Sequence, residues 1–163
     1  MQIISRIINN TWIIAIIILY FNTASAKVIC SVTSATLSFG SLDQTTLERS
    51  STQINVQCNN TGNSTKTGSY TLQFSSGGST DSTKRKMYKL GTLNTKNYNI
   101  YSSPTTLEIL GDGLNGTKTI IGQYYLPKKS AQPKSYIIYA NAPAEVTALP
   151  GDYSDNIIIT LSY

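Results

Sequence analysis

The sequence predicts an all-β protein whose strands form an antiparallel β-sandwich. Short apolar runs alternate with polar residues, as they do where one face of a strand is buried and the other is wet. Clusters of Gly, Pro, Asn and Asp separate these runs and predict frequent turns. The apolar residues after residue 26 do not follow the i, i+3, i+4 spacing of an amphipathic helix.

The first 26 residues have the layout of a secretory signal peptide. One cation, Arg6, precedes an apolar run from Trp12 to Phe21, and the small residues Ala24-Ser25-Ala26 follow it. The run is about ten residues long, whereas a membrane-spanning helix needs roughly 20. We therefore expect cleavage after Ala26, a secreted domain over residues 27–163, and no membrane span once the signal is removed.

The first strand of the expected domain changes phase along its length. Its apolar side chains lie on one face up to residue 32 and on the other face from residue 35. Such a change requires a β-bulge, or a strand that leaves one sheet and joins the opposite one. The two sets are Val28, Cys30 and Val32 before the change, and Ala35, Leu37 and Phe39 after it.

Further strands are expected at intervals along the rest of the chain. Residues 53–58 and 70–74 alternate strictly, and so does the end of the chain, where Ile157, Ile159 and Leu161 share one face. The other candidate strands are residues 98–101, 106–109, 117–126 and 136–140.

The composition excludes most catalytic and metal-binding chemistry. The chain has 163 residues, which suits one domain, with no His and only two Cys. It therefore lacks the residues for a Ser-His-Asp or Cys-His relay and for a His- or Cys-rich zinc site. Nothing places the acids Glu108 and Glu145 together as a hydrolase pair. We expect no enzymatic activity, no metal and no other cofactor.

The expected export from the cytoplasm would place the two cysteines in an oxidising compartment, which affects how they are interpreted. In an oxidising compartment, Cys30 and Cys58 are most simply joined as one structural disulfide. The alternative is a redox-active pair, but a separation of 28 residues is far from the Cys-x-x-Cys spacing.

Several motifs occur in a characteristic order along the expected domain. The segment 30–40 opens it and Cys58 ends the second strand. Arg85-Lys86-Met87 precedes Tyr98-Asn99-Ile100-Tyr101, and Gly111-Asp112-Gly113 precedes Gly116-Thr117. The tail is Pro150-Gly151-Asp152-Tyr153-Ser154-Asp155 followed by residues 157–163. Together they resemble the spore coat protein U domain family, which includes the pilins of archaic chaperone–usher pili.

The resemblance implies an immunoglobulin-like sandwich that lacks one strand. In such subunits a periplasmic chaperone fills the gap first. The amino-terminal strand of another pilin-like subunit then replaces the chaperone during assembly at an outer-membrane usher. The protein is thus expected to pass through the periplasm and to end on the cell surface. Ile157, Ile159 and Leu161 are the expected wall residues of the acceptor groove; the alternative is that they belong to an ordinary closed core.

Two departures from the family pattern affect the expected role. Only Lys27-Val28-Ile29 would precede Cys30 after cleavage. Three residues span about 10 Å, too short to serve as a donor strand. We therefore expect a tip or other minor subunit of a pilus or coat. The alternative is an adhesin or glycan-binding module that is complete without a donor strand. The second departure is Leu110, where the family pattern leads us to expect Trp.

The remaining constellations have ordinary structural interpretations. Lys84-Arg85-Lys86, with Lys89 nearby, is the densest basic patch, but no recognition helix or stacking motif accompanies it. We therefore interpret it as a solvated loop and expect no nucleic-acid partner. The 11 Tyr residues could form a glycan platform, although most are expected in cross-strand pairs. Asp112, Asp152 and Asp155 could suggest calcium, but the sequence has no twelve-residue ligand loop, so we interpret them as turn-formers.

Overall fold

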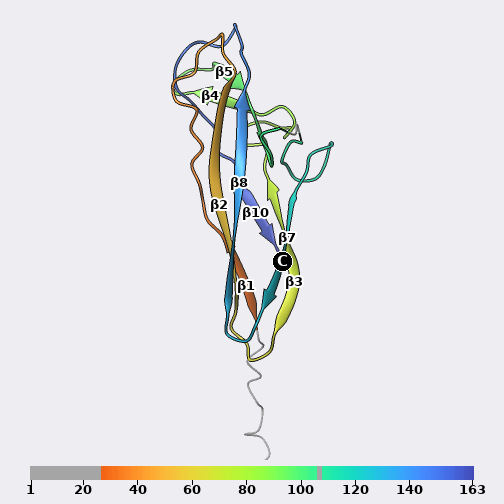
Figure 1. The fold of residues 1–163 in the computed structure, drawn as a ribbon. Coiled ribbons are helices and arrows are strands. Elements are labelled where there is room, and N and C mark those ends of the chain that lie inside the picture. The colour runs from red at the N-terminus through yellow and green to blue at the C-terminus, as the bar shows by residue number, and fades with distance from the viewer. Residues whose placement is uncertain (1–26, 106–107) are drawn as a thin grey trace, which may run out of the picture.

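The fold is an elongated all-β sandwich in the computed structural model, which describes residues 27–105 and 108–163 (Figure 1). The expected signal peptide and residues 106 and 107 of one expected strand lie outside the described residues. Every pairing between the named strands is antiparallel. The described part of the chain contains no helix that is long and apolar enough to cross a membrane.

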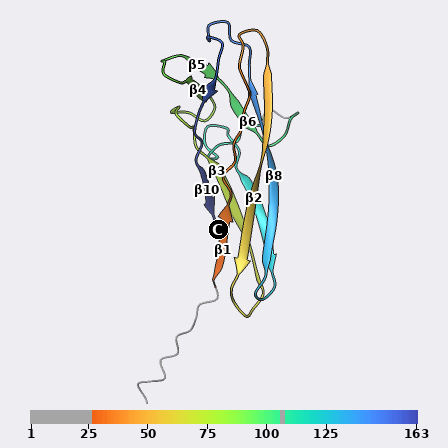
Figure 2. The same ribbon diagram turned by 90° about the vertical axis from the view of Figure 1, so that its left-hand side faces the viewer.

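Two main sheets and one small sheet make up the fold (Figures 1 and 2). The four-stranded sheet has the order β1 (Val28–Val32), β2 (Glu48–Asn60), β8 (Ala131–Ala142) and β6 (Asn99–Tyr101). The facing three-stranded sheet has the order β10 (Ile159–Ser162), β3 (Lys66–Phe74) and β7 (Ile120–Leu126). The small sheet has the order β5 (Thr95–Asn97), β4 (Lys86–Lys89) and β9 (Tyr153–Ser154).

The core lies between the two main sheets and follows the predicted alternation. Ile54, Val56 and Cys58 of β2 are almost completely buried, and so are Leu72 and Phe74 of β3 on the opposite sheet. Alternate residues of these strands face solvent, since successive side chains of a strand point to opposite faces. The predicted antiparallel sandwich is confirmed.

A pair of tyrosines joins the two main sheets inside the sandwich. The hydroxyls of Tyr70 on β3 and Tyr136 on β8 are hydrogen-bonded at 2.8 Å. Gly122 lies opposite Tyr70 in the register of β3 and β7. A Cβ atom on Gly122 would come within 2.2 Å of the Tyr70 ring, so only glycine leaves room for this ring. A bulky polar side chain is thus accommodated where its hydroxyl has a partner.

The predicted disulfide between Cys30 and Cys58 is present. The two residues lie directly opposite one another in the register of β1 and β2, and both side chains are buried. The bridge therefore fixes the short first strand to the longest strand of the sheet.

The strands that the sequence did not predict belong to the small sheet. β4, β5 and β9 have only two to four residues each, too few to show a period of two. The expected strand 117–126 is shorter than predicted because Thr117 belongs to a turn, in which its hydroxyl donates to the carbonyl of Leu114 at 2.8 Å. Leu110, at the position where Trp was expected, is a core residue.

Removal of the disulfide is expected to destabilise the fold. Loop-closure entropy for the sequence separation of 28 between the two cysteines corresponds to roughly 3–4 kcal/mol of unfolding free energy. Urea denaturation of the Cys30→Ala/Cys58→Ala variant should show this loss. The variant under reducing conditions is the control, since reductant should not affect it. An unchanged midpoint for the variant would contradict the assignment.

Candidate functional site

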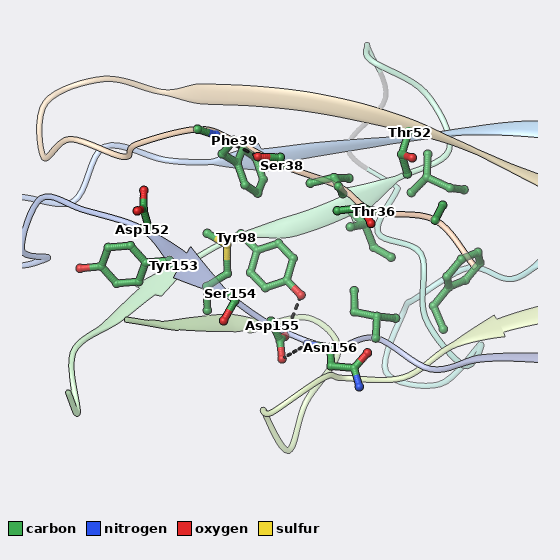
Figure 3. A pocket seen from close by; sticks show the side chains of 18 of the residues that line it. Thr36, Ser38, Phe39, Thr52, Tyr98, Asp152, Tyr153, Ser154, Asp155 and Asn156 are labelled. Carbon is green, nitrogen blue, oxygen red and sulfur yellow. Dashed lines mark hydrogen bonds between the residues drawn. The ribbon is translucent and has the colours of Figure 1, made fainter. Parts of the chain in front are cut away.

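A groove of about 600 Å³ runs along one side of the sandwich (Figure 3). One wall is the segment 35–41, which continues from β1, and the other wall comes from residues 152–159. The floor consists of core side chains from five strands and the residue before β6. These floor residues are Ile54, Phe74, Met87, Tyr98, Ile100 and Ile138, with Thr52 beside them.

The first wall exists because the chain stops pairing with β2 shortly after β1 ends. The amide of Thr33 still donates to the carbonyl of Asn55 at 2.9 Å. Among the described residues, no backbone-to-backbone hydrogen bond involves residues 34–41, although the Ser50 hydroxyl donates to the carbonyl of Ser38. This is the point at which the sequence predicted a change of phase, and Ala35, Leu37 and Phe39 all line the groove.

The second wall is paired on its outer side only. β9 is paired with β4, and β10 is paired with β3; both are edge strands of their sheets. Between them, the amide of Ser75 donates to the carbonyl of Ile158 at 3.0 Å. The groove therefore runs between two chain segments whose inner edges carry backbone groups without a strand beside them.

One end of the groove is closed by the main chain itself. Leu42 and Gly151 exchange two backbone hydrogen bonds, each of 3.1 Å, and form an isolated antiparallel bridge. The two walls meet at this bridge. Along the groove, away from the bridge, they are no longer hydrogen-bonded to each other. Gly151 has a φ of 140°, a conformation that residues with a Cβ atom rarely adopt, so glycine suits this junction.

A partly buried hydrogen bond connects the second wall to the floor. The Tyr98 hydroxyl donates to Oδ2 of Asp155 at 2.7 Å, as the dashed line in Figure 3 shows. Oδ1 of Asp155 accepts the amides of Gly78 and Asn156, each at 2.8 Å. Burial and then the hydrogen bond to Asp155 raise the pKa of Tyr98 well above its usual range, so Tyr98 remains a donor at neutral pH. Asp155 thus connects the wall, the floor and the turn after β3.

Arg85 holds the segment after β3 in place beside this hydrogen-bond network. The sequence pattern did not identify this residue as part of the groove's support. Its side chain is fully buried, not solvated as expected for the Lys84–Lys86 patch. It donates to the carbonyl of Ser75 at 2.7 Å, the carbonyl of Ser82 at 3.0 Å and the amide oxygen of Asn99 at 2.8 Å. Burial lowers the pKa of the guanidinium from its ordinary value, and the neighbouring Tyr98 and Asp155 partly offset this effect.

The structure brings two of the three predicted wall residues to the groove. Ile157 and Ile159 line it, whereas Leu161 lies opposite Leu72 in the pairing of β10 with β3. The groove also uses Leu37 and Phe39, which the phase change after residue 32 could have indicated. Ile158, between the two wall residues, is 65% exposed.

The other candidate sites take structural roles in the described part of the chain. No group of three or more His, Cys, Asp or Glu side chains that could hold a metal ion occurs there. The carboxylate of Asp112 accepts the amide of Leu114 at 3.0 Å, as in a turn. The carboxylate of Glu145 accepts the amide of Asn97 at 2.9 Å. These acids therefore contribute to loop geometry.

Comparison with protein families identifies the chain. The spore coat protein U domain matches residues 19–160. The chain belongs to the spore coat protein U domain family. The match covers the disulfide, both groove walls and the closing motif of this domain. A comparison with curated proteins found no match.

A solved structure supports the same fold for this spore coat protein U domain. The chain is similar to one in the crystal structure of the CsuC–CsuE chaperone–tip adhesion subunit pre-assembly complex from archaic chaperone–usher Csu pili of Acinetobacter baumannii. The TM-score is 0.53 at 12% identity, over 84% of this chain and 40% of that chain. Our chain thus spans well under half of the length of that protein.

The Tyr98–Asp155 hydrogen bond is expected to be strongly coupled. Tyr98→Phe should reduce the unfolding free energy by about 1–3 kcal/mol, because a partly buried carboxylate loses a charge-assisted hydrogen bond from a buried tyrosine. In a double-mutant cycle with Asp155→Ala, the double variant should lose clearly less stability than the sum of the two single variants. The difference is the coupling energy between the two side chains, and it should account for much of the loss seen in Tyr98→Phe. Tyr88→Phe is the matched control, since Tyr88 donates to the carbonyl of Gly78 at the surface. If Tyr98→Phe and Tyr88→Phe reduce the unfolding free energy equally, the Tyr98–Asp155 hydrogen bond stabilises the protein no more than a surface hydrogen bond does.

Proposed function

We propose that this protein is a secreted structural subunit of a surface pilus or coat, assembled by donor-strand complementation. The single observation that supports the proposal is the groove, a slot with an apolar floor between two chain segments that lack a strand between them. An added strand would supply main-chain hydrogen bonds to both walls and alternate side chains to the floor. Ile157 and Ile159 are the proposed wall residues that contact it.

The length of the groove agrees with this proposal. Seven residues, 35–41, form the first wall, and an extended strand rises about 3.3 Å per residue. A donor segment of about seven residues therefore matches the wall, and about half of its side chains would face the apolar floor. An exposed slot of this kind favours aggregation, which explains the need for a chaperone in transit.

The proposed partners are a periplasmic chaperone, other pilin-like subunits and an outer-membrane usher. The similar solved structure is itself a complex of a chaperone with a tip adhesion subunit. The proposed route is cleavage of residues 1–26 as a signal peptide, passage through the periplasm and display on the cell surface. Family membership also favours a structural protein rather than an enzyme.

Within such an assembly we assign the chain a tip or minor position. If cleavage follows Ala26, only Lys27, Val28 and Ile29 precede Cys30. Val28 and Ile29 are already paired with Asn60 and Asn59 in β1 and β2. The mature protein would accept a strand but would have no segment left to donate.

The groove predicts opposite results for two neighbouring isoleucines. Ile157→Arg places a charge at the groove and should abolish recovery of the tagged subunit with its cognate periplasmic chaperone when the two are co-expressed. Ile158→Arg, the matched control at an exposed position, should leave recovery unchanged. Co-purification from the periplasm measures both.

Two outcomes would count against strand acceptance. One is equal chaperone recovery for the two arginine variants. The other is a wild-type protein that is soluble, monomeric and fully folded when produced without any chaperone.

A second candidate function, adhesion, is favoured by the end of the sandwich where the groove is closed (top of Figure 1). Leu90 and Leu93, in the turn between β4 and β5, are 90% and 98% exposed. Val146 and Leu149, between β8 and β9, are exposed beside the same loops. A hydrogen bond from the Lys89 ammonium to the Pro150 carbonyl at 2.7 Å connects these two loops.

The chemistry of this apolar end suits an apolar surface better than a glycan. The four exposed side chains named above are aliphatic, so they offer neither an aromatic stacking face nor hydrogen-bond donors. Exposed leucines on a monomer mark contact sites when they gather in one place. We infer that the subunit could attach to apolar material through these loops while the groove remains occupied.

Adhesion through the loops predicts a loss of binding to an apolar support. Leu90→Ser/Leu93→Ser should reduce retention of the protein on octyl-coated beads severalfold, because two exposed apolar side chains are lost. Ile121→Ser, which removes a side chain that is 70% exposed on β7, is the control and should have little effect. Retention that falls equally in the control would mean that the apolar end is not a specific contact site.

A further inference from the structure

The positive charge of the chain is separated from its negative charge along the sequence. Residues 49–80 and 113–144 contain no acidic residue. The eight acids are Asp43, Glu48, Asp81, Glu108, Asp112, Glu145, Asp152 and Asp155. Both acid-free segments are therefore positively charged, since residues 49–80 and 113–144 contain basic residues: Arg49, Lys66, Lys118, Lys128, Lys129 and Lys134.

The fold brings these acid-free segments together at one end of the sandwich, where β1 begins (bottom of Figure 1). This end consists of the start of β1, the turn between β2 and β3, and the turn between β7 and β8. It carries four lysines and no acid, and we refer to it as the basic end. These lysines are Lys27, Lys66, Lys128 and Lys129.

Hydrogen bonds hold the basic end in a fixed shape. The buried side chain of Asn60 donates to the carbonyl oxygens of Ser64 at 2.8 Å and Pro127 at 3.0 Å, which connects the two turns. The amide of Lys129 donates to the carbonyl of Gly62 at 3.1 Å. The Lys27 carbonyl accepts the hydroxyl of Thr61 at 3.1 Å. The lysines are therefore displayed on a common scaffold rather than on independent loops.

The surroundings of the lysines favour a broad anionic surface over a small anion. None of these lysines lines the groove or the second, polar cavity beside the turn after β3. Two exposed side chains, Ile29 on β1 and Tyr125 on β7, lie on the strands that reach this end. Lysine with an amphipathic tyrosine and an aliphatic neighbour is typical of a surface that contacts lipid headgroups.

The sequence supplies a reason for lipid in particular. The apolar run ends at Phe21, six residues before Lys27, so an extended connection spans about 20 Å at most. Whenever that run is inserted in a bilayer before cleavage, the basic end is held next to the headgroups. We propose that the basic end binds the anionic headgroup surface of a phospholipid bilayer. The contact would keep the folding domain at the membrane and leave the groove free along its side.

Vesicle sedimentation with the full chain tests this proposal. Affinity for vesicles that contain phosphatidylglycerol should exceed affinity for pure phosphatidylcholine by about tenfold at low salt. The preference should fall as salt shortens the Debye length. Residues 1–26 are present in every variant, so their contribution to the lipid preference cancels when the variants are compared with one another.

Two double variants with the same change in charge locate the contact. Lys128→Gln/Lys129→Gln should lose most of the preference for phosphatidylglycerol. Lys84→Gln/Lys86→Gln, which changes two exposed lysines in the half of the molecule that carries the acids, should retain it. Circular dichroism and an intact disulfide confirm that each variant is folded.

Three results would overturn the proposal. The first is equal binding to the two kinds of vesicle, and the second is an equal loss in the two double variants. The third is tighter binding to an oligonucleotide or to polyglutamate than to phosphatidylglycerol vesicles, because it would assign the basic end to a polyanionic polymer. None of these results depends on strand acceptance by the groove.

Discussion

The loss of pairing between the first strand and β2 after Thr33 is the feature on which the rest of the structure depends. Up to Val32 the strand is paired, and Cys30 joins it covalently to Cys58. Beyond that point its inward side chains belong to the opposite parity, and they cannot remain in the same sheet and still face the core. The chain therefore separates from the sheet, and it meets the far wall only at the Leu42–Gly151 bridge. The groove is the space that this separation leaves.

Such an opening would collapse unless its far wall were held in place. A wall of edge strands has few contacts of its own, since β9 has two residues and β10 has four. The hydrogen bonds of Asp155 with Tyr98 and Gly78 supply the missing support, and Arg85 orders the turn behind them. A guanidinium suits this position because it can donate to several carbonyl oxygens at once and so satisfy them away from water. Polar groups thus stabilise a site whose floor is apolar.

The two ends of the molecule differ in chemistry. Exposed aliphatic side chains gather on the loops at one end, and lysines without acids gather at the other. The proposed acceptor groove runs along the side between them, so strand pairing, attachment to apolar material and contact with a membrane would use separate surfaces. Separate surfaces agree with the proposed route, in which the subunit contacts a membrane first, then binds a chaperone and then joins an assembly.

The sequence by itself determined the fold class, most of the long strands and the disulfide. Strict alternation in residues 53–58 and 70–74 leaves one orientation in which the apolar side chains are buried, and two cysteines allow one pairing. It also determined that Ile157 and Ile159 face inward, but not which space they face.

Only the tertiary structure showed that a groove is present and which side chains hold its walls in place. Whether an inward residue contacts a closed core or an open slot depends on how far apart two segments lie, and those segments are more than a hundred residues apart in sequence. For the same reason the sequence misjudged Arg85, because a local run of three basic residues does not reveal that the middle one has carbonyl partners elsewhere. The basic end is a further case: its lysines are scattered along the chain, and the pairing of distant strands alone brings them together.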